Sequence, residues 1–286
     1  DMINKLMGND RSALAHIGKV PFGHLSNELV STLKKEVDLL LDTSASIAVQ
    51  RTLDKEFGSG IARFTLFLTP NGENLVMFYT PKGTSVSHFM LEAQYYAWLL
   101  SDSKYHDLLK TEVEGYTYSG DSCRSISFRL STHNVSLLSS IASKAIENYQ
   151  SRDSPLAINW SIMKDLSVEC IQIPLSGFDT VNIGDGPNVQ VSHSLLNEIH
   201  EIRGEALPNE TGGTLIGSYD VISNTIIVVA HIPAPSDSKS SPLSFERGTE
   251  GLEDAVTTIE KITHKNLVYI GEWHSHPNGV SPEPSE

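Results

Sequence analysis

Apolar and polar residues alternate at two different periods along residues 24–173, which predicts a succession of helices and strands, whereas residues 1–23 show no clear period. Residues 24–36 carry apolar side chains at helical spacing, and residues 37–41 form a continuous apolar run like that of a buried strand. Asp42-Thr43-Ser44 ends this run, and residues 45–53 again favour a helix. This order is typical of a doubly wound α/β sheet, in which turns after strands line a ligand crevice. Asp42 is therefore a candidate binding residue; alternatively, Asp42 or Ser44 caps the next helix.

A hairpin and an aromatic helix follow in the same half of the chain. Two strand-like segments, 62–69 and 75–80, flank Pro70-Asn71-Gly72, and this turn signal predicts a β-hairpin. An amphipathic pattern over 88–100 predicts a helix, whose aromatic stripe we interpret as core rather than as a ligand site. The pattern further predicts a helix at 134–148 and strands at 157–163 and 168–173.

Residues 174–188 are rich in Gly, Pro and Asp, and we place a domain boundary there. The expected domains are residues 1–180 and residues 188–286. The overall class is α/β, with a mixture of α+β character. In the second domain the pattern predicts helices ending near residue 204 and at 252–262, and strands at 189–191, 214–217, 225–232 and 267–270.

Composition and charge exclude several classes of protein. The chain has 286 residues and a formal net charge of -14, which argues against a general binder of nucleic acid or of anionic membranes. No apolar run approaches the roughly 20 residues of a membrane span, and the first residues lack the features of a signal peptide. With only 2 cysteines, a reducing cytoplasm is the simplest setting.

Two histidines near the end of the sequence are candidate metal ligands. His274 and His276 follow an apolar strand pattern and point to one face if the strand continues, and Pro277 ends it. Two adjacent imidazoles can share a zinc ion, although such a pair also fits an ordinary polar strand face. Glu210 stands beside Gly212 and Gly213, which allow close backbone packing around a buried carboxylate.

These residues resemble a known family. Residues 188–286, with Glu210 in ETGGTLIG and His274 and His276 in GEWHSHP, are similar to an MPN/JAMM-type zinc metallopeptidase domain. The resemblance implies a cytidine-deaminase-like α/β fold, bound Zn²⁺ and hydrolysis of a peptide bond. Glu210 would be the general base, and Ser285, or less well Ser281, would stabilise the oxyanion.

One ligand of the family motif falls outside the sequence. The metal-binding Asp would stand at about the second residue beyond Glu286, so we expect the natural chain to be longer. Glu272 shares the histidines' face and is an alternative ligand, but a structural role fits it better. With two protein ligands instead of three, zinc affinity of the sequence as it stands should be poor.

The first domain has a weaker resemblance. The segment KKEVDLLLDTSASIAVQRTL, at 34–53, is similar to part of ThiF/ubiquitin-activating-type adenylation enzymes, and so is RSALAHIGKV at 11–20. The resemblance implies a partial Rossmann-like adenylation domain in which Asp42 lies near the nucleotide and its metal. The Gly-rich nucleotide loop is missing from the sequence, so ATP is expected only for a full-length adenylation domain.

The two cysteines receive different interpretations. Cys123 lies in the polar loop SGDSCRS beside Arg124, which suits a thioester-forming nucleophile, and the alternative is an unreactive thiol. Cys170 falls within a predicted strand and is expected in the core.

Three functions are consistent with these features. The first is a zinc metallopeptidase that hydrolyses peptide or isopeptide bonds at the C-terminus of a ubiquitin-like protein, as part of a bacterial ubiquitin-like conjugation system. The second is an enzyme that activates a ubiquitin-like protein by adenylation, and the third is a non-catalytic scaffold that binds such a modifier. A homodimer is left open, and neither nucleic acid nor a membrane is an expected partner.

Overall fold

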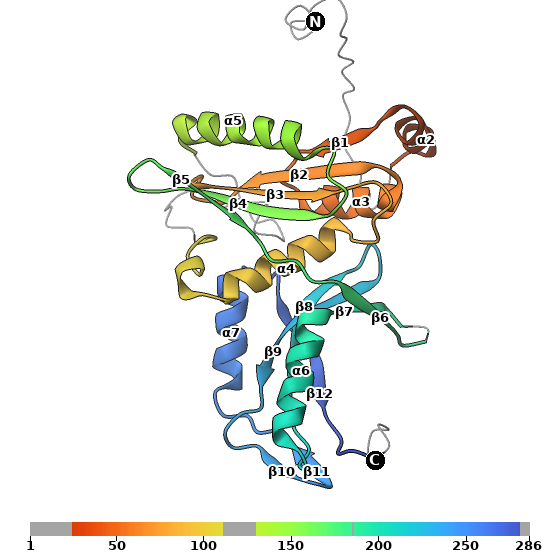
Figure 1. The fold of residues 1–286 in the computed structure, drawn as a ribbon, viewed down its shortest axis with the longest axis vertical. Coiled ribbons are helices and arrows are strands. Elements are labelled where there is room, and N and C mark those ends of the chain that lie inside the picture. The colour runs from red at the N-terminus through yellow and green to blue at the C-terminus, as the bar shows by residue number, and fades with distance from the viewer. Residues whose placement is uncertain (1–24, 111–129, 185, 281–286) are drawn as a thin grey trace, which may run out of the picture.

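Two five-stranded sheets form the two ends of the molecule, and one helix lies between them (Figure 1). The computed structural model describes residues 25–110, 130–184 and 186–280. The helix between the sheets is α4, His88–Leu100, and it contacts β3 and β4 of one sheet and β9 of the other. The described part of the chain is therefore a mixed α/β structure whose halves are joined by α4.

The N-terminal sheet has the strand order β1-β2-β3-β4-β5. Its strands are β1 (Leu39–Asp42), β2 (Ala62–Leu68), β3 (Asn74–Thr80), β4 (Leu156–Ile162) and β5 (Val168–Gln172). The predicted hairpin is present, with β2 and β3 antiparallel and Leu68 opposite Leu75. Only β1 and β2 are parallel among the neighbouring strands, so the expected doubly wound, Rossmann-like sheet is not confirmed. Tight turns join β2 to β3 and β4 to β5, and such turns permit only antiparallel neighbours.

The helices of this half begin at serines. They are α2 (Asn27–Glu36), α3 (Ile47–Phe57), α4 and α5 (Thr132–Tyr149), with short 3₁₀ turns η1 (Gly58–Gly60) and η2 (Ser103–Tyr105). Ser26, Ser46 and Ser87 each accept a hydrogen bond from a backbone N–H of the first turn, which satisfies a donor that the helix leaves unpaired. The cap of α3 is thus Ser46, and not Asp42 or Ser44 as considered from the sequence.

The C-terminal sheet has the order β12-β8-β9-β7-β6, with β7 and β9 parallel and the other neighbours antiparallel. Its strands are β6 (Phe178–Asn182), β7 (Asn188–Ser192), β8 (Gly212–Asp220), β9 (Thr225–Pro233) and β12 (Val268–His274). The helices of this half are α6 (His193–Ala206) and α7 (Leu252–Ile262). A small hairpin of β10 (Lys239–Ser241) and β11 (Ser244–Glu246) stands between β9 and α7. Because β6 lies within 174–188, this sheet begins inside the segment interpreted as a boundary.

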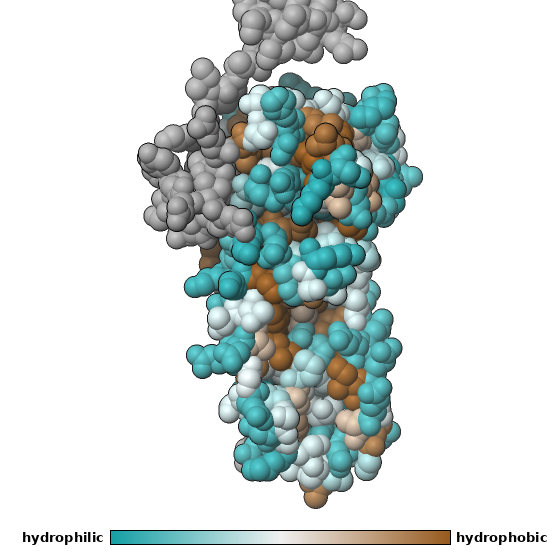
Figure 2. All heavy atoms as spheres, turned by 90° about the vertical axis from the view of Figure 1, so that its left-hand side faces the viewer, coloured by the Kyte–Doolittle hydropathy of each residue, from teal (hydrophilic) through white to brown (hydrophobic). Residues whose placement is uncertain are grey.

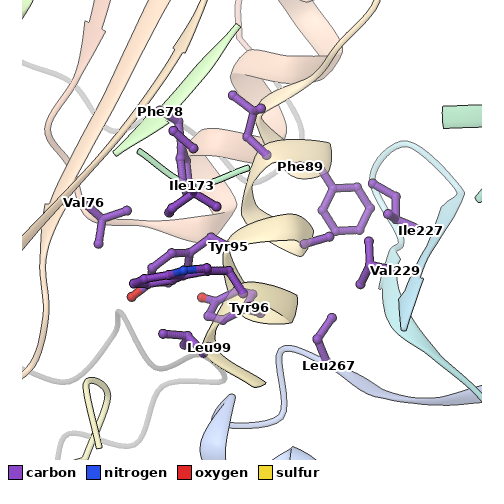
Figure 3. Packing of buried hydrophobic residues seen from close by; sticks show 14 of the residues in the cluster. Val76, Phe78, Phe89, Tyr95, Tyr96, Leu99, Ile173, Ile227, Val229 and Leu267 are labelled. Carbon is purple, nitrogen blue, oxygen red and sulfur yellow. The ribbon is translucent and has the colours of Figure 1, made fainter. Parts of the chain in front are cut away.

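The main hydrophobic core is shared by both sheets. In Figure 3, Tyr95 of α4 lies toward Val76 and Phe78 of the N-terminal sheet, while Phe89 lies toward Ile227 and Val229 of the C-terminal sheet. Helix α4 is therefore buried on most of its circumference, which explains why its sequence is apolar and aromatic almost all round. The prediction that this aromatic stripe is core is confirmed.

Buried charges also join the two halves. The guanidinium of Arg51 in α3 lies 2.5 Å from Glu92 of α4 and 3.8 Å from Asp220 at the end of β8. It also lies over the ring of Phe89, 3.9 Å from the ring centroid. Asp220 in turn accepts hydrogen bonds from the backbone of Ile222 and Ser223 and so shapes the turn into β9. One cation on α3 therefore contacts both the central helix and the C-terminal sheet.

On the face seen in Figure 2, patches of hydrophobic side chains lie between more numerous hydrophilic ones. This pattern agrees with the excess of acidic residues in the sequence. Within the described residues, no helix has the length and apolar character that crossing a membrane would require.

His264 should make the stability of the fold sensitive to acid. Burial lowers the pKa of its imidazole below the usual value, and a hydrogen bond with the backbone of Leu109 acts in the opposite direction. The unfolded chain, with its higher pKa, binds the proton first as pH falls. The free energy of unfolding should therefore fall as the pH drops from the ordinary histidine pKa, about 6.5, to the lowered one.

The variant His264→Asn tests this effect, because asparagine also tolerates the positive φ of 50° at this position. Urea unfolding should be measured at several pH values between neutrality and the acid range. The variant should lose less stability on acidification than the parent protein. Equal losses in both proteins would remove His264 as a source of the acid sensitivity.

Candidate active site

The end of β12 brings the two candidate histidines together. β12 is an edge strand paired with β8, with Trp273 opposite Gly213 and His274 opposite Gly212. His276 lies just beyond the last residue of the strand, and its ring centroid is 4.8 Å from that of His274. The adjacent imidazoles expected from the sequence are thus present, although the chain leaves the strand between them.

Glu210 stands directly beside this pair. It precedes β8 and is 6% exposed, and its Oε1 lies 3.3 Å from Nδ1 of His276. The contact has the distance of an ion pair but not the geometry of a hydrogen bond, because Nδ1 of His276 is a buried nitrogen without a hydrogen-bond partner in the described structure. The fold therefore gathers Glu210, His274 and His276, which are far apart in sequence, at one edge of the C-terminal sheet.

Two glycines make this close approach possible. A Cβ atom on Gly212 would stand 2.4 Å from the carbonyl oxygen of Trp273 and 2.5 Å from the ring of Phe245. On Gly213 it would stand 2.6 Å from the carbonyl oxygen of Ile232. These distances are shorter than any van der Waals contact, so a larger residue would push β8 away from β12 and from the β10–β11 hairpin. The inference from the sequence that these glycines allow close packing agrees with this geometry.

The backbone around Glu210 is held by residues that the sequence did not single out. Its N–H donates to the carbonyl oxygen of Ser241 at 2.9 Å, and its carbonyl oxygen accepts from Oγ of Ser240. Both serines belong to β10, in a stretch (233–248) that is rich in Ser and Pro. A Ser-rich loop is a weak signal, because nothing local shows which distant backbone groups its hydroxyls will meet.

Arg203, in the last turn of α6, holds the other side of the site. Its Nε and Nη2 donate to the carbonyl oxygen of His276 at 3.1 and 2.9 Å, and Nη2 also reaches Oδ1 of Asn278 at 2.9 Å. The chain after the histidines is thereby tied to α6. The sequence gave no sign of this contact beyond the presence of a basic residue near a helix C-terminus.

Glu272 bonds to residues other than the histidines. Its carboxylate accepts from Nη2 of Arg247 at 2.7 Å and from the hydroxyl of Tyr269 at 3.3 Å. This is the structural role that the sequence favoured over metal ligation.

The described residues fit a zinc ion in part. Imidazole nitrogens are common zinc ligands, and a catalytic zinc takes three protein ligands. His274 and His276 supply two, and Nδ1 of His276 is a buried polar atom without a hydrogen-bond partner within the described ranges. No group of three His, Cys, Asp or Glu able to hold a metal occurs among the described residues. Ser281 and Ser285 lie outside these residues, so the proposed oxyanion contact stays a prediction.

The candidates of the N-terminal half have separate outcomes. Asp42 is buried at the end of β1, where its Oδ1 accepts from the N–H and the hydroxyl of Ser44 at 2.9 and 2.7 Å. Its role toward a nucleotide stays a prediction, and Cys123 lies outside the described residues. The expectation that Cys170 is core is wrong, because β5 is an edge strand and the cysteine is exposed on it. Partial burial still raises the pKa of its thiol.

Comparison with protein families identifies the class to which this site is similar. Residues 192–286 match the family described as prokaryotic homologs of the JAB domain. The match covers α6, β8, β9, α7 and β12, and hence Glu210 and both histidines. The C-terminal part of the chain is therefore similar to JAB-type domains, and the match does not reach the N-terminal sheet.

Two curated proteins show similarity to the chain. A CD-NTase/cGAS isopeptidase of Enterobacter hormaechei subsp. hoffmannii (strain UCI 50) is 40% identical over 97 residues, which are 34% of this chain and 52% of the relative. The probable metalloprotease y4qB of Sinorhizobium fredii (strain NBRC 101917 / NGR234) is 33% identical over 76 residues, 27% of this chain and 46% of the relative. The chain thus spans about half the length of the curated relatives it matches. Their names support a hydrolase of the peptidase or isopeptidase type.

Proposed function

We propose that this chain belongs to a zinc-dependent peptidase that hydrolyses peptide or isopeptide bonds at the C-terminus of a ubiquitin-like protein. The observation that carries the proposal is the nearly buried carboxylate of Glu210, 3.3 Å from His276, whose ring adjoins that of His274. The names of the two relatives, an isopeptidase and a probable metalloprotease, support the reaction type. The ubiquitin-like substrate is implied by the family resemblance described above.

In this proposal His274 and His276 would hold the metal. Bound zinc supplies a Lewis acid that activates water and polarises the scissile carbonyl. The contribution of the chain itself is the carboxylate of Glu210. It would accept a proton from the attacking water at Oε1 and pass it to the leaving amine. The backbone of Glu210 is held by β10 through two hydrogen bonds, so the position from which its side chain extends is set before substrate arrives.

A protein tail is the substrate that suits the rim of the site. The β10–β11 hairpin bonds to the backbone of Glu210 through Ser240 and Ser241, and Leu243 in its turn is 89% exposed. An apolar side chain so placed can contact an extended peptide that approaches the carboxylate. This arrangement supports a macromolecular substrate over a small hydrophilic one.

The proposal is tested with the protein in its full natural length. Cleavage of a ubiquitin-like precursor is followed together with metal content by elemental analysis. We expect about one zinc ion per chain, loss of turnover after treatment with a chelator, and recovery on addition of Zn²⁺. Cleavage that persists in metal-free protein would exclude the mechanism, and a zinc-loaded protein that cleaves no such precursor would exclude the substrate.

His276→Ala gives a sharper form of the same test. Removal of one imidazole should lower zinc content and turnover together, since a catalytic zinc depends on each of its few protein ligands. The matched control is His200→Ala, because His200 is exposed on α6. The control should keep both zinc and turnover. If His276→Ala retained full zinc content and activity, the metal would have to lie elsewhere.

A further inference from the structure

Ser275 stands between the two histidines but turns away from them. Successive side chains alternate along an extended chain, so the residue between two ligands on one side points to the other. Ser275 is 8% exposed, which is low for a hydroxyl-bearing residue at the edge of a sheet. A buried hydroxyl needs a hydrogen-bond partner, and the identity of that partner indicates what the serine does.

The partner of Ser275 is the residue that follows the proposed general base. Its Oγ accepts from the backbone N–H of Thr211 at 3.1 Å, and its own N–H donates to the carbonyl oxygen of Thr211 at 2.7 Å. These two bonds close a small ring between Thr211 and Ser275. Because Glu210 precedes Thr211, and the two histidines flank Ser275, the ring ties the carboxylate-bearing segment to the imidazole-bearing segment.

The ring continues the β8–β12 ladder beyond its last backbone pair. That pair is Gly212 and His274, and the next position along the two chains joins Thr211 to Ser275. In an antiparallel ladder a backbone carbonyl would accept the second bond. Here the hydroxyl of Ser275 accepts it instead, while the carbonyl oxygen of the next residue, His276, is bound by Arg203. The chain can thus leave the strand at His276 without leaving the N–H of Thr211 unpaired.

We propose that Ser275 is a positioning residue that sets the carboxylate of Glu210 against the imidazoles of His274 and His276. This inference rests on the proposed function, because it assigns Ser275 a part in the same reaction. The other hydrogen bonds to the backbone of Glu210 come from Ser240 and Ser241 of the hairpin. They do not connect Glu210 to the histidine-bearing segment. The pair of bonds between Thr211 and Ser275 joins the two segments at the residues adjacent to Glu210, His274 and His276.

The test compares Ser275→Ala with Ser275→Thr. Alanine removes the acceptor, and threonine keeps a hydroxyl and suits an extended backbone. Ser275→Ala should lower kcat about 10- to 100-fold with KM little changed, because a displaced base affects the reaction more than substrate binding. Zinc content should stay at the parent level, and Ser275→Thr should recover most of kcat. The matched control is Ser218→Ala in β8, which should change neither constant.

Amide hydrogen exchange provides a readout that does not depend on turnover. In Ser275→Ala the N–H of Thr211 should exchange faster than in the parent, while the N–H of Ile216, deeper in β8, should be unchanged. Full kcat in Ser275→Ala, or a kcat loss that threonine does not repair, would overturn the positioning role while leaving the peptidase intact. Absence of turnover in the zinc-loaded parent would instead overturn the proposed function and the role of Ser275 with it.

Discussion

Replacement of Glu210 by Gln is expected to lower turnover by at least about 10²- to 10⁴-fold, the usual contribution of a general acid–base group, while zinc content stays unchanged. Glutamine has the same shape as glutamate but cannot accept a proton at the working pH. The bonds that hold residue 210 come from Ser240 and Ser241 and involve its backbone, so the substitution preserves them. Steady-state kinetics and elemental analysis of the same sample measure the two effects.

Glu272→Gln is the matched control for this experiment. Glu272 is an acidic residue two positions before His274, and its carboxylate is paired with Arg247 rather than with a histidine. The control removes one negative charge near the site and should leave turnover close to that of the parent protein. If Glu210→Gln kept its turnover, the assignment of Glu210 as general base would be wrong. If both variants lost turnover equally, the effect would reflect local charge rather than proton transfer.

Replacement of Arg51 by Met is expected to lower the free energy of unfolding by about 3–5 kcal/mol, the cost of breaking a buried ion pair from one side. The side chains of Arg51, Glu92 and Asp220 are 8%, 1% and 6% exposed. Methionine fills a similar volume but leaves two buried carboxylates without their cation. Urea unfolding followed by circular dichroism measures the loss.

Two further variants identify the cause of that loss. In a Glu92→Gln background, Arg51→Met should lower the free energy of unfolding by less than in the parent. The reason is that only one buried carboxylate, that of Asp220, then loses its cation. Lys144→Ala breaks an exposed pair with Glu147 on α5, where both side chains are 65% exposed, and should change stability by no more than about 1 kcal/mol. A loss for Arg51→Met no larger than that of Lys144→Ala would show that the buried pair contributes little.

Local sequence patterns predicted most of the elements of this protein. The turn signal Pro70-Asn71-Gly72 between two apolar segments led to the β2–β3 hairpin, and the aromatic pattern of 88–100 led to a buried helix. Glu210 and the two histidines became candidate site residues because ETGGTLIG and GEWHSHP resemble the motif of MPN/JAMM-type domains. Each of these features depends on neighbouring residues, on side-chain alternation or on a short motif, all of which are visible without a fold.

The direction of the strands and the burial of their side chains could not be predicted from local sequence patterns. The order of helix, strand and helix around Asp42 suggested a largely parallel sheet, but the strands that follow β2 pair in antiparallel fashion. Cys170 has the pattern of a strand residue, and its exposure follows from the place of β5 at the sheet edge. A strand pattern defines which residues are extended, whereas the neighbours of the strand define which of them are covered.

The sequence by itself supplied the chemical groups of the candidate site, namely a carboxylate, two imidazoles and the glycines that let the backbone approach them. Only the tertiary structure decided what holds those groups, namely Ser275 on Thr211, Ser240 and Ser241 on Glu210, and Arg203 on His276. The tertiary structure also shows that α4 packs against both sheets and that Arg51 pairs with Asp220. The physical reason is that a hydroxyl or guanidinium bonds to whatever backbone group the fold brings near, and no local pattern of residues names that partner.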